Sequence, residues 1–248
     1  MFRSSRLVWA PGLVLAAGAV ILALNGCGTG VLAPSGTGAA RGLDASSATP
    51  RTYVITSRVT TVAINGGAGT IMVTGSSRST IAVTEQAYYS VTRKPPTTSH
   101  VVSGTTLTLS YSCPAQLTCG VAYDVQVPRG VTVRVSDREG AITLASLAGP
   151  VQANTIAGVI TATGLASPAV TLASTAGSVT AAFTAVPASV TASTNAGSIT
   201  LTVPDSAAYQ VHAHTYVGNS AVTVHQSATS KSVINASCDL GNVTISPS

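Results

Sequence analysis

Hydrophobic and polar residues alternate along the C-terminal half of the chain, and the alternation is fixed to a recurring glycine. Apolar residues stand seven and five positions before this glycine, and usually again two and four positions after it. The glycines are spaced by 18, 19, 20, 21 and 23 residues and are Gly140, Gly158, Gly177, Gly197, Gly218 and Gly241. A period of two on both sides of a glycine predicts two short strands joined by a tight bend.

Repetition of this unit predicts the architecture. A period near twenty residues is typical of thin coils that stack, because one coil cannot bury its apolar side alone. We therefore expect an all-β, β-solenoid-like stack over residues 133–245, with about 20 residues and two strands per coil. Gly218 is an exception in the pattern, because the apolar pair after it, Val222 and Val224, comes two residues late.

Residues 53–135 show the same alternation less regularly. Alternating runs at 81–83, 107–111 and 121–127 are interrupted by Arg93-Lys94-Pro95-Pro96, which is typical of a turn or loop. No segment has a sustained helical period. We expect a less regular N-terminal β layer that closes one end of the stack, because an open end exposes unpaired backbone groups.

The first residues of the chain predict export. Arg3 and Arg6 precede an uncharged apolar run over 7–24. The run ends in Leu24-Asn25-Gly26-Cys27, which resembles the lipobox of bacterial lipoproteins. That resemblance implies cleavage after residue 26 and lipid attachment to Cys27. The alternative is an uncleaved signal anchor, because the apolar run is just long enough to span a bilayer.

Both alternatives place the rest of the chain at the cell membrane, on its extracytoplasmic side. We divide the chain into a signal peptide (1–26), a flexible tether rich in Gly, Ser, Thr and Pro (27–50) and a β-strand-repeat domain (51–248). The formal net charge is +5, but the basic residues are scattered, so the sequence predicts no nucleic-acid partner.

A set of motifs resembles a known family. Tyr-Val-Ile opens the domain at 53–55, and Gly-Ala-Gly-Thr-Ile-Met-Val follows at 67–73. A cysteine pair then precedes Tyr-Asp-Val-Gln-Val-Pro-Arg-Gly at 123–130 and the glycine repeats. Together these are similar to a bacterial cell-envelope family of β-strand-repeat proteins of unknown function, labelled putative adhesins. The resemblance covers about residues 52–246 and implies an exported β-repeat domain without defined catalytic or binding residues.

The cysteines predict a local crosslink. Cys113 and Cys119 are close in sequence, and outside the cytoplasm a disulfide between them is expected. Cys238 stands three residues before a repeat glycine, at a small inward position that other coils fill with Thr or Ser. We expect Cys238 to be a buried, unreactive thiol, and a long-range disulfide to either of the other two is the alternative.

Candidate chemistry is sparse. His212 and His214 alternate with inward-facing Val211 and Ala213, so both point to solvent without a third ligand, and we predict no metal site and no cofactor. The only cluster of charged residues that contains acidic groups is Arg134, Asp137, Arg138 and Glu139, where solvated ion pairs are the ordinary interpretation. A carbohydrate-active β-helix enzyme that uses Asp137, Arg138 and Glu139 is the alternative to a non-catalytic protein.

One column of identical residues stands out. The position after the first apolar residue of each second strand is threonine, at Thr143, Thr161, Thr180, Thr200, Thr223 and Thr244. Alternation turns these side chains outward, and stacking spaces them by roughly 4.8 Å. Such a column arises from strand preference alone, and it also forms a candidate binding face for a cell-wall or extracellular polysaccharide or a protein.

We therefore expect a lipid-anchored, extracytoplasmic β-repeat protein that acts as a binding, adhesion or structural module of the cell envelope and is not an enzyme. Its expected contact with the membrane is the N-terminal lipid.

Overall fold

The computed structural model describes residues 45–90, 94–114 and 119–248. Every regular element in these residues is a β-strand, and none of the described residues form a helix with the length and apolarity of a membrane span. Cys27, the predicted signal peptide and most of the predicted tether lie outside the described residues. The last part of the predicted tether contains a short strand, β1 (Ala45–Ser47).

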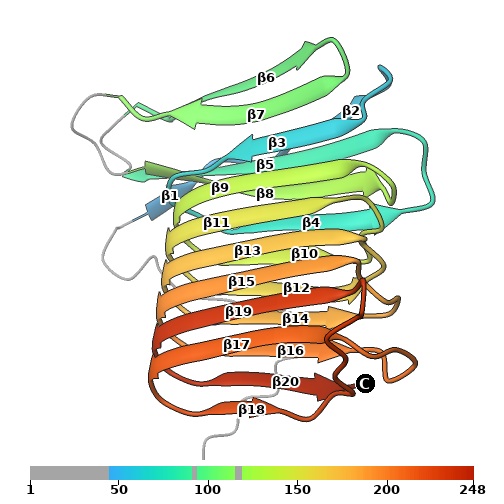
Figure 1. Cartoon of the computed structure of the whole chain (residues 1–248). Coiled ribbons are helices and arrows are strands. Elements are labelled where there is room, and N and C mark those ends of the chain that lie inside the picture. The colour runs from blue at the N-terminus through green and yellow to red at the C-terminus, as the bar shows by residue number, and fades with distance from the viewer. Residues whose placement is uncertain (1–44, 91–93, 115–118) are drawn as a thin grey trace, which may run out of the picture. The chain divides into compact units, whose positions relative to one another are not determined.

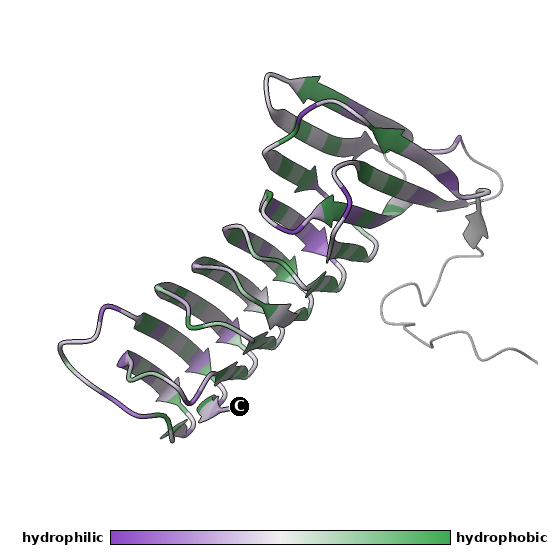
Figure 2. Ribbon diagram, turned by 90° about the vertical axis from the view of Figure 1, so that its right-hand side faces the viewer, coloured by the Kyte–Doolittle hydropathy of each residue, from purple (hydrophilic) through white to green (hydrophobic). Residues whose placement is uncertain are grey.

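The strands of the described residues form two sheets that face each other across the core (Figures 1 and 2). Sheet A has the order β1, β5 (Ile81–Ser90), β8 (Cys119–Pro128), β4 (Ile71–Ser76), β10 (Ile142–Ala145), β12 (Ile160–Leu165), β14 (Val179–Phe183), β16 (Ile199–Val203), β20 (Val243–Pro247), β18 (Ser220–Val222), with β2 (Arg51–Ile55) also paired to β5. Sheet B has the order β17 (Gln210–Val217), β19 (Val233–Leu240), β15 (Ser189–Ala196), β13 (Ala169–Ala176), β11 (Val151–Ala157), β9 (Thr132–Glu139), β3 (Thr61–Asn65), β7 (Thr106–Ser112), β6 (Thr97–Ser103).

Each coil contributes one strand to each sheet, so the predicted β-solenoid-like stack is confirmed. Neighbouring coils pair in parallel and in register: Val151 of β11 lies opposite Val133 of β9 and Val170 of β13. The alternating apolar residues of both sheets point into one continuous core, which includes fully buried Leu172 and Leu201. Val, Ile, Leu and Ala fill most of this narrow core, so few aromatic side chains are needed.

The bends between the two strands of a coil are built from stacked glycines. The N–H of Gly140 donates to the carbonyl of Ala157 in the next coil (3.0 Å), and the bends at Gly158, Gly177 and Gly197 repeat this bond. Gly140 has a φ of 143°, and a Cβ there would collide with the carbonyl oxygen of Gly69 in the adjacent coil. Only glycine allows both the conformation and the close backbone approach.

A column of polar side chains lies next to these bends. The residue three positions before the glycine points inward, and in four coils it donates to the carbonyl of the glycine in the adjacent coil, whereas the buried hydroxyl of Thr155 has no partner among the described residues. The donor–acceptor pairs are Ser174 to Gly158 (3.0 Å), Thr194 to Gly177 (2.8 Å), Cys238 to Gly197 (3.1 Å) and Thr215 to Gly241 (2.8 Å). The small hydroxyl or thiol thus satisfies a backbone carbonyl that a purely apolar residue would leave without a partner.

Asp137 occupies this polar column, because it lies opposite Thr155 in the β9–β11 pairing. Its side chain is 8% exposed, and neither carboxylate oxygen has a hydrogen-bond partner among the described residues. Gly66 makes room for it, since a Cβ on Gly66 would collide with Oδ1 of Asp137. Burial raises the pKa of Asp137 to about 7 against the lowering effect of the nearby Arg138 backbone N–H, and the charge of Glu139 adds to the rise.

The coils do not stack in sequence order at the C-terminal end. The last coil, β19–β20, inserts between β15–β16 and β17–β18, so β17 and β18 form the end of the stack. The sequence after Gly218 departs from the other coils, as expected. Ser220 and Val222 lie opposite Val243 and Ile245, but Ser220 is exposed, whereas Val222 packs on the core and Val224 is buried.

The N-terminal end is less regular, as expected. The coil β7–β8 lies outside β3–β4, although it follows β3–β4 in sequence. Antiparallel strands complete this end: β5 pairs with β8, β1 and β2 pair with β5, and β6 pairs with β7 (Figure 1). This antiparallel layer is the N-terminal cap of the stack.

A charged substitution should lower the stability much more on the inner face of a strand than on its outer face. Leu201 and Val190 are fully buried, so Leu201→Asp or Val190→Asp puts an unpaired charge in the core and should cost several kcal/mol. Thr200 and Thr191, one residue away on the outer faces, should tolerate Asp at a cost of about 1 kcal/mol or less. Thermal melts of the four variants measure this contrast, and equal losses at neighbouring positions would contradict the single-core stack.

Asp137 should make stability depend on pH. Its folded-state pKa of about 7 lies above the ordinary value of 3.8, so the folded state favours the neutral acid. The stabilisation is complete below about pH 4 and is lost as the pH rises towards about 7, a total of up to roughly 4 kcal/mol. Asp137→Asn should remove this dependence and leave the variant more stable than the wild type at pH 8.

Chemical denaturation of wild type and Asp137→Asn between pH 4 and pH 8 measures the difference. Asp124→Asn is the matched control, because Asp124 is exposed on the outer face of β8. A stability difference between wild type and Asp137→Asn that stays constant across this range would show that Asp137 is ionised throughout.

Candidate functional site

The outer face of sheet A carries the threonines predicted as a column. Five lie side by side in one row, because in-register pairing joins Thr143, Thr161, Thr180, Thr200 and Thr244 on neighbouring strands. At the strand spacing of a β-sheet, this threonine row is roughly 19 Å long. The hydroxyl-bearing side chains are half-buried, except for the exposed Thr244.

Thr223 does not belong to the threonine row, which corrects the prediction. Strand β18 ends at Val222, and Ala221 is the residue opposite Thr244. The prediction failed because it took Val222, and not Ser220, as the residue that lies opposite Val243. Thr223 follows the strand, and its N–H and hydroxyl both donate to the carbonyl of Ile245.

The threonine row ends where another residue type takes the same outward position. At the C-terminal end this residue is Ala221, opposite Thr244. Towards the N-terminal cap, exposed Met72 lies opposite Thr143 and is followed by Asp124. A second row beside it is irregular, since the β12–β14 register shifts between Ala162 and Leu165. The face therefore offers one regular file of hydroxyls and not a two-dimensional lattice.

The alternative catalytic cluster does not converge. Asp137 points into the core, whereas Arg138 and Glu139 at the end of β9 are exposed. Arg134 also lies on the outer face of β9. The expected solvated ion-pair set is therefore wrong for Asp137, because alternation and the space left by Gly66 turn its carboxylate inward. Asp137 is buried and Glu139 is exposed, so these two carboxylates do not line one open groove as a glycosidase pair does.

The N-terminal cap holds a feature that the sequence did not reveal. Glu85 lies on the inward face of β5, beside Ile81 and Val83, and is 4% exposed. The hydroxyl of Tyr53 on β2 donates to Oε1 of Glu85 (2.5 Å), and the Tyr53 ring stacks on His100 of β6 at a centroid distance of 4.4 Å. Burial, together with the nearby Glu85, raises the pKa of Tyr53 above its usual value.

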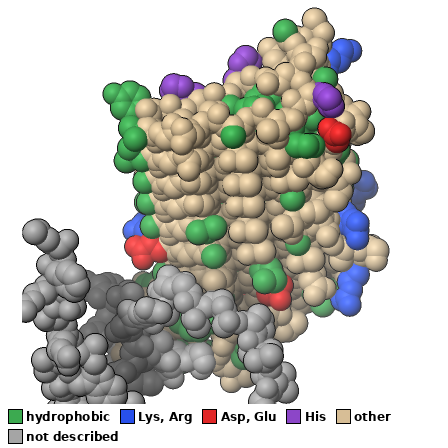
Figure 3. Space-filling model, turned by 90° about the horizontal axis from the view of Figure 1, so that it is seen from below, with side chains coloured by type: hydrophobic (Ala, Val, Ile, Leu, Met, Phe, Trp, Pro, Cys, Tyr) green, Lys and Arg blue, Asp and Glu red, His purple; other side chains and the backbone are tan. Residues whose placement is uncertain are grey.

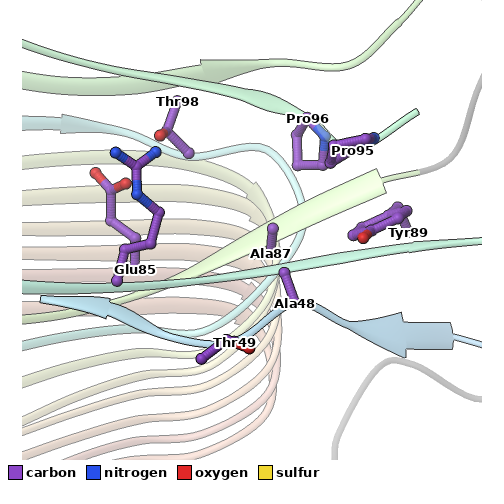
Figure 4. Close-up of a pocket in the computed structure, with 9 residues that line it drawn as sticks. Ala48, Thr49, Glu85, Ala87, Tyr89, Pro95, Pro96 and Thr98 are labelled. Carbon is purple, nitrogen blue, oxygen red and sulfur yellow. The ribbon is translucent and has the colours of Figure 1, made fainter.

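Glu85 also lines a cavity of about 230 Å³ within the N-terminal cap (Figure 4). Arg51 of β2 lies opposite Glu85 of β5 in the strand register and provides the other charged group of the cavity lining. The remaining wall is mainly apolar and comes from β5 and from the segments beside it, including Ala48, Ala87, Tyr89, Pro95 and Pro96. The Glu85 carboxylate and the Arg51 guanidinium, in apolar surroundings, can orient a small polar group. Among the described lining residues, none is a second carboxylate or a histidine that could act beside Glu85 in catalysis.

A signal for Glu85 was present in the sequence. Alternation through 81–89 places Glu85 in an apolar inward column, where a carboxylate needs a hydrogen-bonding partner. The partner, Tyr53, lies on an antiparallel strand whose register the glycine pattern does not specify.

The cysteines and histidines occupy ordinary structural positions. Cys113 and Cys119 form a disulfide with a Cα–Cα distance of 5.8 Å, while Cys238 is a buried free thiol. His212 and His214 are exposed on the outer face of β17. Across the described ranges, no group of three His, Cys, Asp or Glu side chains has the arrangement of a metal site. Lipid attachment at Cys27 stays a prediction, since it lies outside these ranges.

Comparison with known proteins supports the family resemblance. Among solved structures, the chain is similar to a putative cell adhesion protein from Clostridium sporogenes, with 13% identity over 81% of this chain and 100% of that chain and a TM-score of 0.47. A putative adhesin from Bacteroides fragilis shows 16% identity over 81% and 97% of the two chains, with a TM-score of 0.39.

A putative lipid binding protein from Parabacteroides distasonis shows 11% identity over 80% of this chain and 96% of that chain, with a TM-score of 0.29. No curated protein matches the chain. Residues 54–246 match the family model described as Toastrack DUF4097, which spans most of the chain. The chain therefore belongs to the Toastrack DUF4097 family.

Proposed function

We propose that this chain is a lipid-anchored, extracytoplasmic binding module of the cell envelope and is not an enzyme. The observation that carries the proposal is the threonine row, five in-register threonines on the outer face of a stack with a continuous core. The ligand class that suits this row is a cell-wall or extracellular polysaccharide.

Two features support a location outside the cytoplasm. The first is the N-terminal sequence, in which a positive start and an apolar run lead to Cys27. The second is the disulfide between Cys113 and Cys119, a crosslink that persists mainly in oxidising compartments. These features are independent, since one concerns the leader and the other the folded domain.

The chemistry of the threonine row supports a polysaccharide ligand. Each threonine offers a hydroxyl that donates and accepts hydrogen bonds, as sugar hydroxyls do. The side of the stack in Figure 3 consists mostly of uncharged polar side chains and backbone, with Lys, Arg, Asp and Glu mainly towards its margins. Hydroxyls repeated at a fixed spacing suit a ligand that also repeats, because several weak contacts form together.

Charges on the threonine row should abolish binding. We expect the triple variant Thr161→Glu, Thr180→Glu and Thr200→Glu to lose co-sedimentation with insoluble peptidoglycan and extracellular polysaccharide from the source cells. Three carboxylates would repel one another and would present strongly hydrated charges where sugar hydroxyls should bind. Because these side chains lie on the outer face, the variant should still fold, which its thermal melt checks.

The matched control places the same three charges on sheet B, at Gln152→Glu, Thr171→Glu and Thr191→Glu, which also form an outward row. The control should bind as the wild type does. Equal loss in both variants, or no binding by the wild type, would contradict the threonine row as the binding face.

Lipid attachment has a separate test. Cys27→Ser should move the protein from the membrane fraction to the medium, or leave an unprocessed precursor, because serine cannot accept the thioether-linked lipid. Fractionation and immunoblotting of cells that produce each form measure the outcome. A Cys27→Ser protein that is processed and retained in the membrane like the wild type would refute the lipoprotein assignment.

A further inference from the structure

The stack ends at β17 and β18, and their outer edges have no strand beside them in the described residues. The direction of the hydrogen bonds shows which groups are free. Gln210 donates its N–H towards β19, to the carbonyl of Ser232 (2.9 Å). Alternation along a strand then turns the N–H and C=O groups of Val211, Ala213 and Thr215 away from β19, towards the open edge.

The free part of this edge is short and sharply bounded. The backbone groups of Tyr209 also point away from β19, but they already have partners. Its N–H donates to the carbonyl of His225 (2.8 Å), and its carbonyl accepts from the N–H of Ser227 (2.9 Å). The segment 225–227 therefore covers the edge before β17, and the bend at Gly218 ends it. Residues 211–215 form the open edge that lies between these two boundaries.

This open edge lacks the features that usually prevent strand pairing. Exposed edges in native proteins are commonly protected by Lys, Pro or inward-pointing charges, and Gln210–Val217 contains no Pro, Lys, Arg, Asp or Glu. The inward residues Val211 and Ala213 are only half-buried, although they pack on the core. Beside the edge, Tyr216 is 82% exposed, Val217 54% and Leu240 56%.

The opposite end of sheet B differs. Strand β6 follows Lys94-Pro95-Pro96 and is exposed on both faces, so pairing along it would bury no inward apolar row. The N-terminal cap is also antiparallel, unlike the parallel coil at the C-terminal end. Strand β18 is only three residues long, and β2 belongs to the antiparallel cap, so among the described edges the β17 of another copy matches β17 best.

We propose that the open edge of β17 pairs antiparallel with the same edge of a second copy, about a two-fold axis, to form a closed dimer. Such a pairing satisfies the free backbone groups of Ala213 and Thr215, covers Val211 and Ala213, and brings no Lys, Arg, Asp or Glu of β17 face to face. A two-fold contact uses each edge once, so assembly stops at two copies.

The segment 225–227 sets the register of this pairing. If the two-fold axis passed through Ala213, then Tyr209 and the covering segment 225–227 of the second copy would lie at Val217 and overlap it. If the axis passes through His214, that segment lies beyond Gly218. Ala213 of each copy then forms a hydrogen-bonded pair with Thr215 of the other. His214 then faces His214 of the second copy in a non-hydrogen-bonded pair, and His212 faces Tyr216.

Cysteine crosslinking in the full chain tests both the contact and its register. Opposed residues of a non-hydrogen-bonded pair have Cα atoms about 4.5 Å apart, within the range of a disulfide. His214→Cys should therefore run as a dimer on a non-reducing gel and as a monomer after reduction. His212→Cys is the matched control and should stay monomeric, because its counterpart lies four residues away along the second copy.

A proline pair tests the same edge without a crosslink. Ala213→Pro removes an N–H that points off the sheet, so the fold should survive while the dimer is lost. His212→Pro removes an N–H that faces β19 and should lower the melting temperature instead. Analytical ultracentrifugation of the full chain in detergent should give a dimer for the wild type and a monomer for Ala213→Pro.

Several outcomes would overturn the proposal. A monomeric wild type, equal crosslinking of the two cysteine variants, or a ladder of larger species would each exclude the closed β17 dimer. If Ala213→Pro fails to fold, the cysteine pair still decides the question. Polysaccharide binding by the threonine row is a separate property, so either proposal can fail without the other.

Discussion

The close approach of backbone at the glycine bends is the constraint on which the stack depends. Each bend glycine except Gly218, at the end of the stack, donates its N–H to the adjacent coil, and a Cβ at Gly158 or Gly241 would collide with the glycine carbonyl stacked against it. All regular coils must therefore turn at the same point. Once the bends are aligned, the register of both sheets is fixed, because a slip by one residue would send every inward side chain to the outside. The threonine row and the polar column follow from this alignment.

The same backbone contact explains why the coils need not stack in sequence order. Bend glycines and parallel strands fit any neighbouring coil, so side-chain burial decides which coil lies at the end. The coil β19–β20 offers Ile234 and Val243 to the core, whereas β17–β18 offers Val211 and Ser220 at the matching positions. Placing β17–β18 at the end keeps Ser220 near solvent and both Ile234 and Val243 buried, which favours the observed order.

Much of the fold was predictable because alternation assigns a face to each residue. From Val133 onwards, the period of two correctly identified the inward residues of nearly every coil, and the glycines marked the bends. The order of the coils was not predictable, since backbone pairing carries no side-chain code. Thr223 was misplaced for a related reason: a valine pair suggested a late strand, and only the partner strand β20 shows that Ser220 lies opposite Val243. The Glu85–Tyr53 contact depends on an antiparallel register that no repeat encodes.

The distinctive chemistry of the domain gathers where the repeat is broken. Where most other coils have a hydroxyl or thiol that donates to a glycine carbonyl, the parallel coil β9–β10 has Asp137, in the space left by Gly66. Glu85 is buried in the N-terminal cap, where the hydroxyl of Tyr53 donates to it. The cap is held by its own antiparallel pairing, so its inward positions are free of the glycine register. In the regular coils a charge on an inward position would disturb a core only two side chains deep, so variation is confined to the outer faces. A binding surface built from repeated coils therefore has to use the outward rows, and the longest uniform outward run on sheet A is the threonine row.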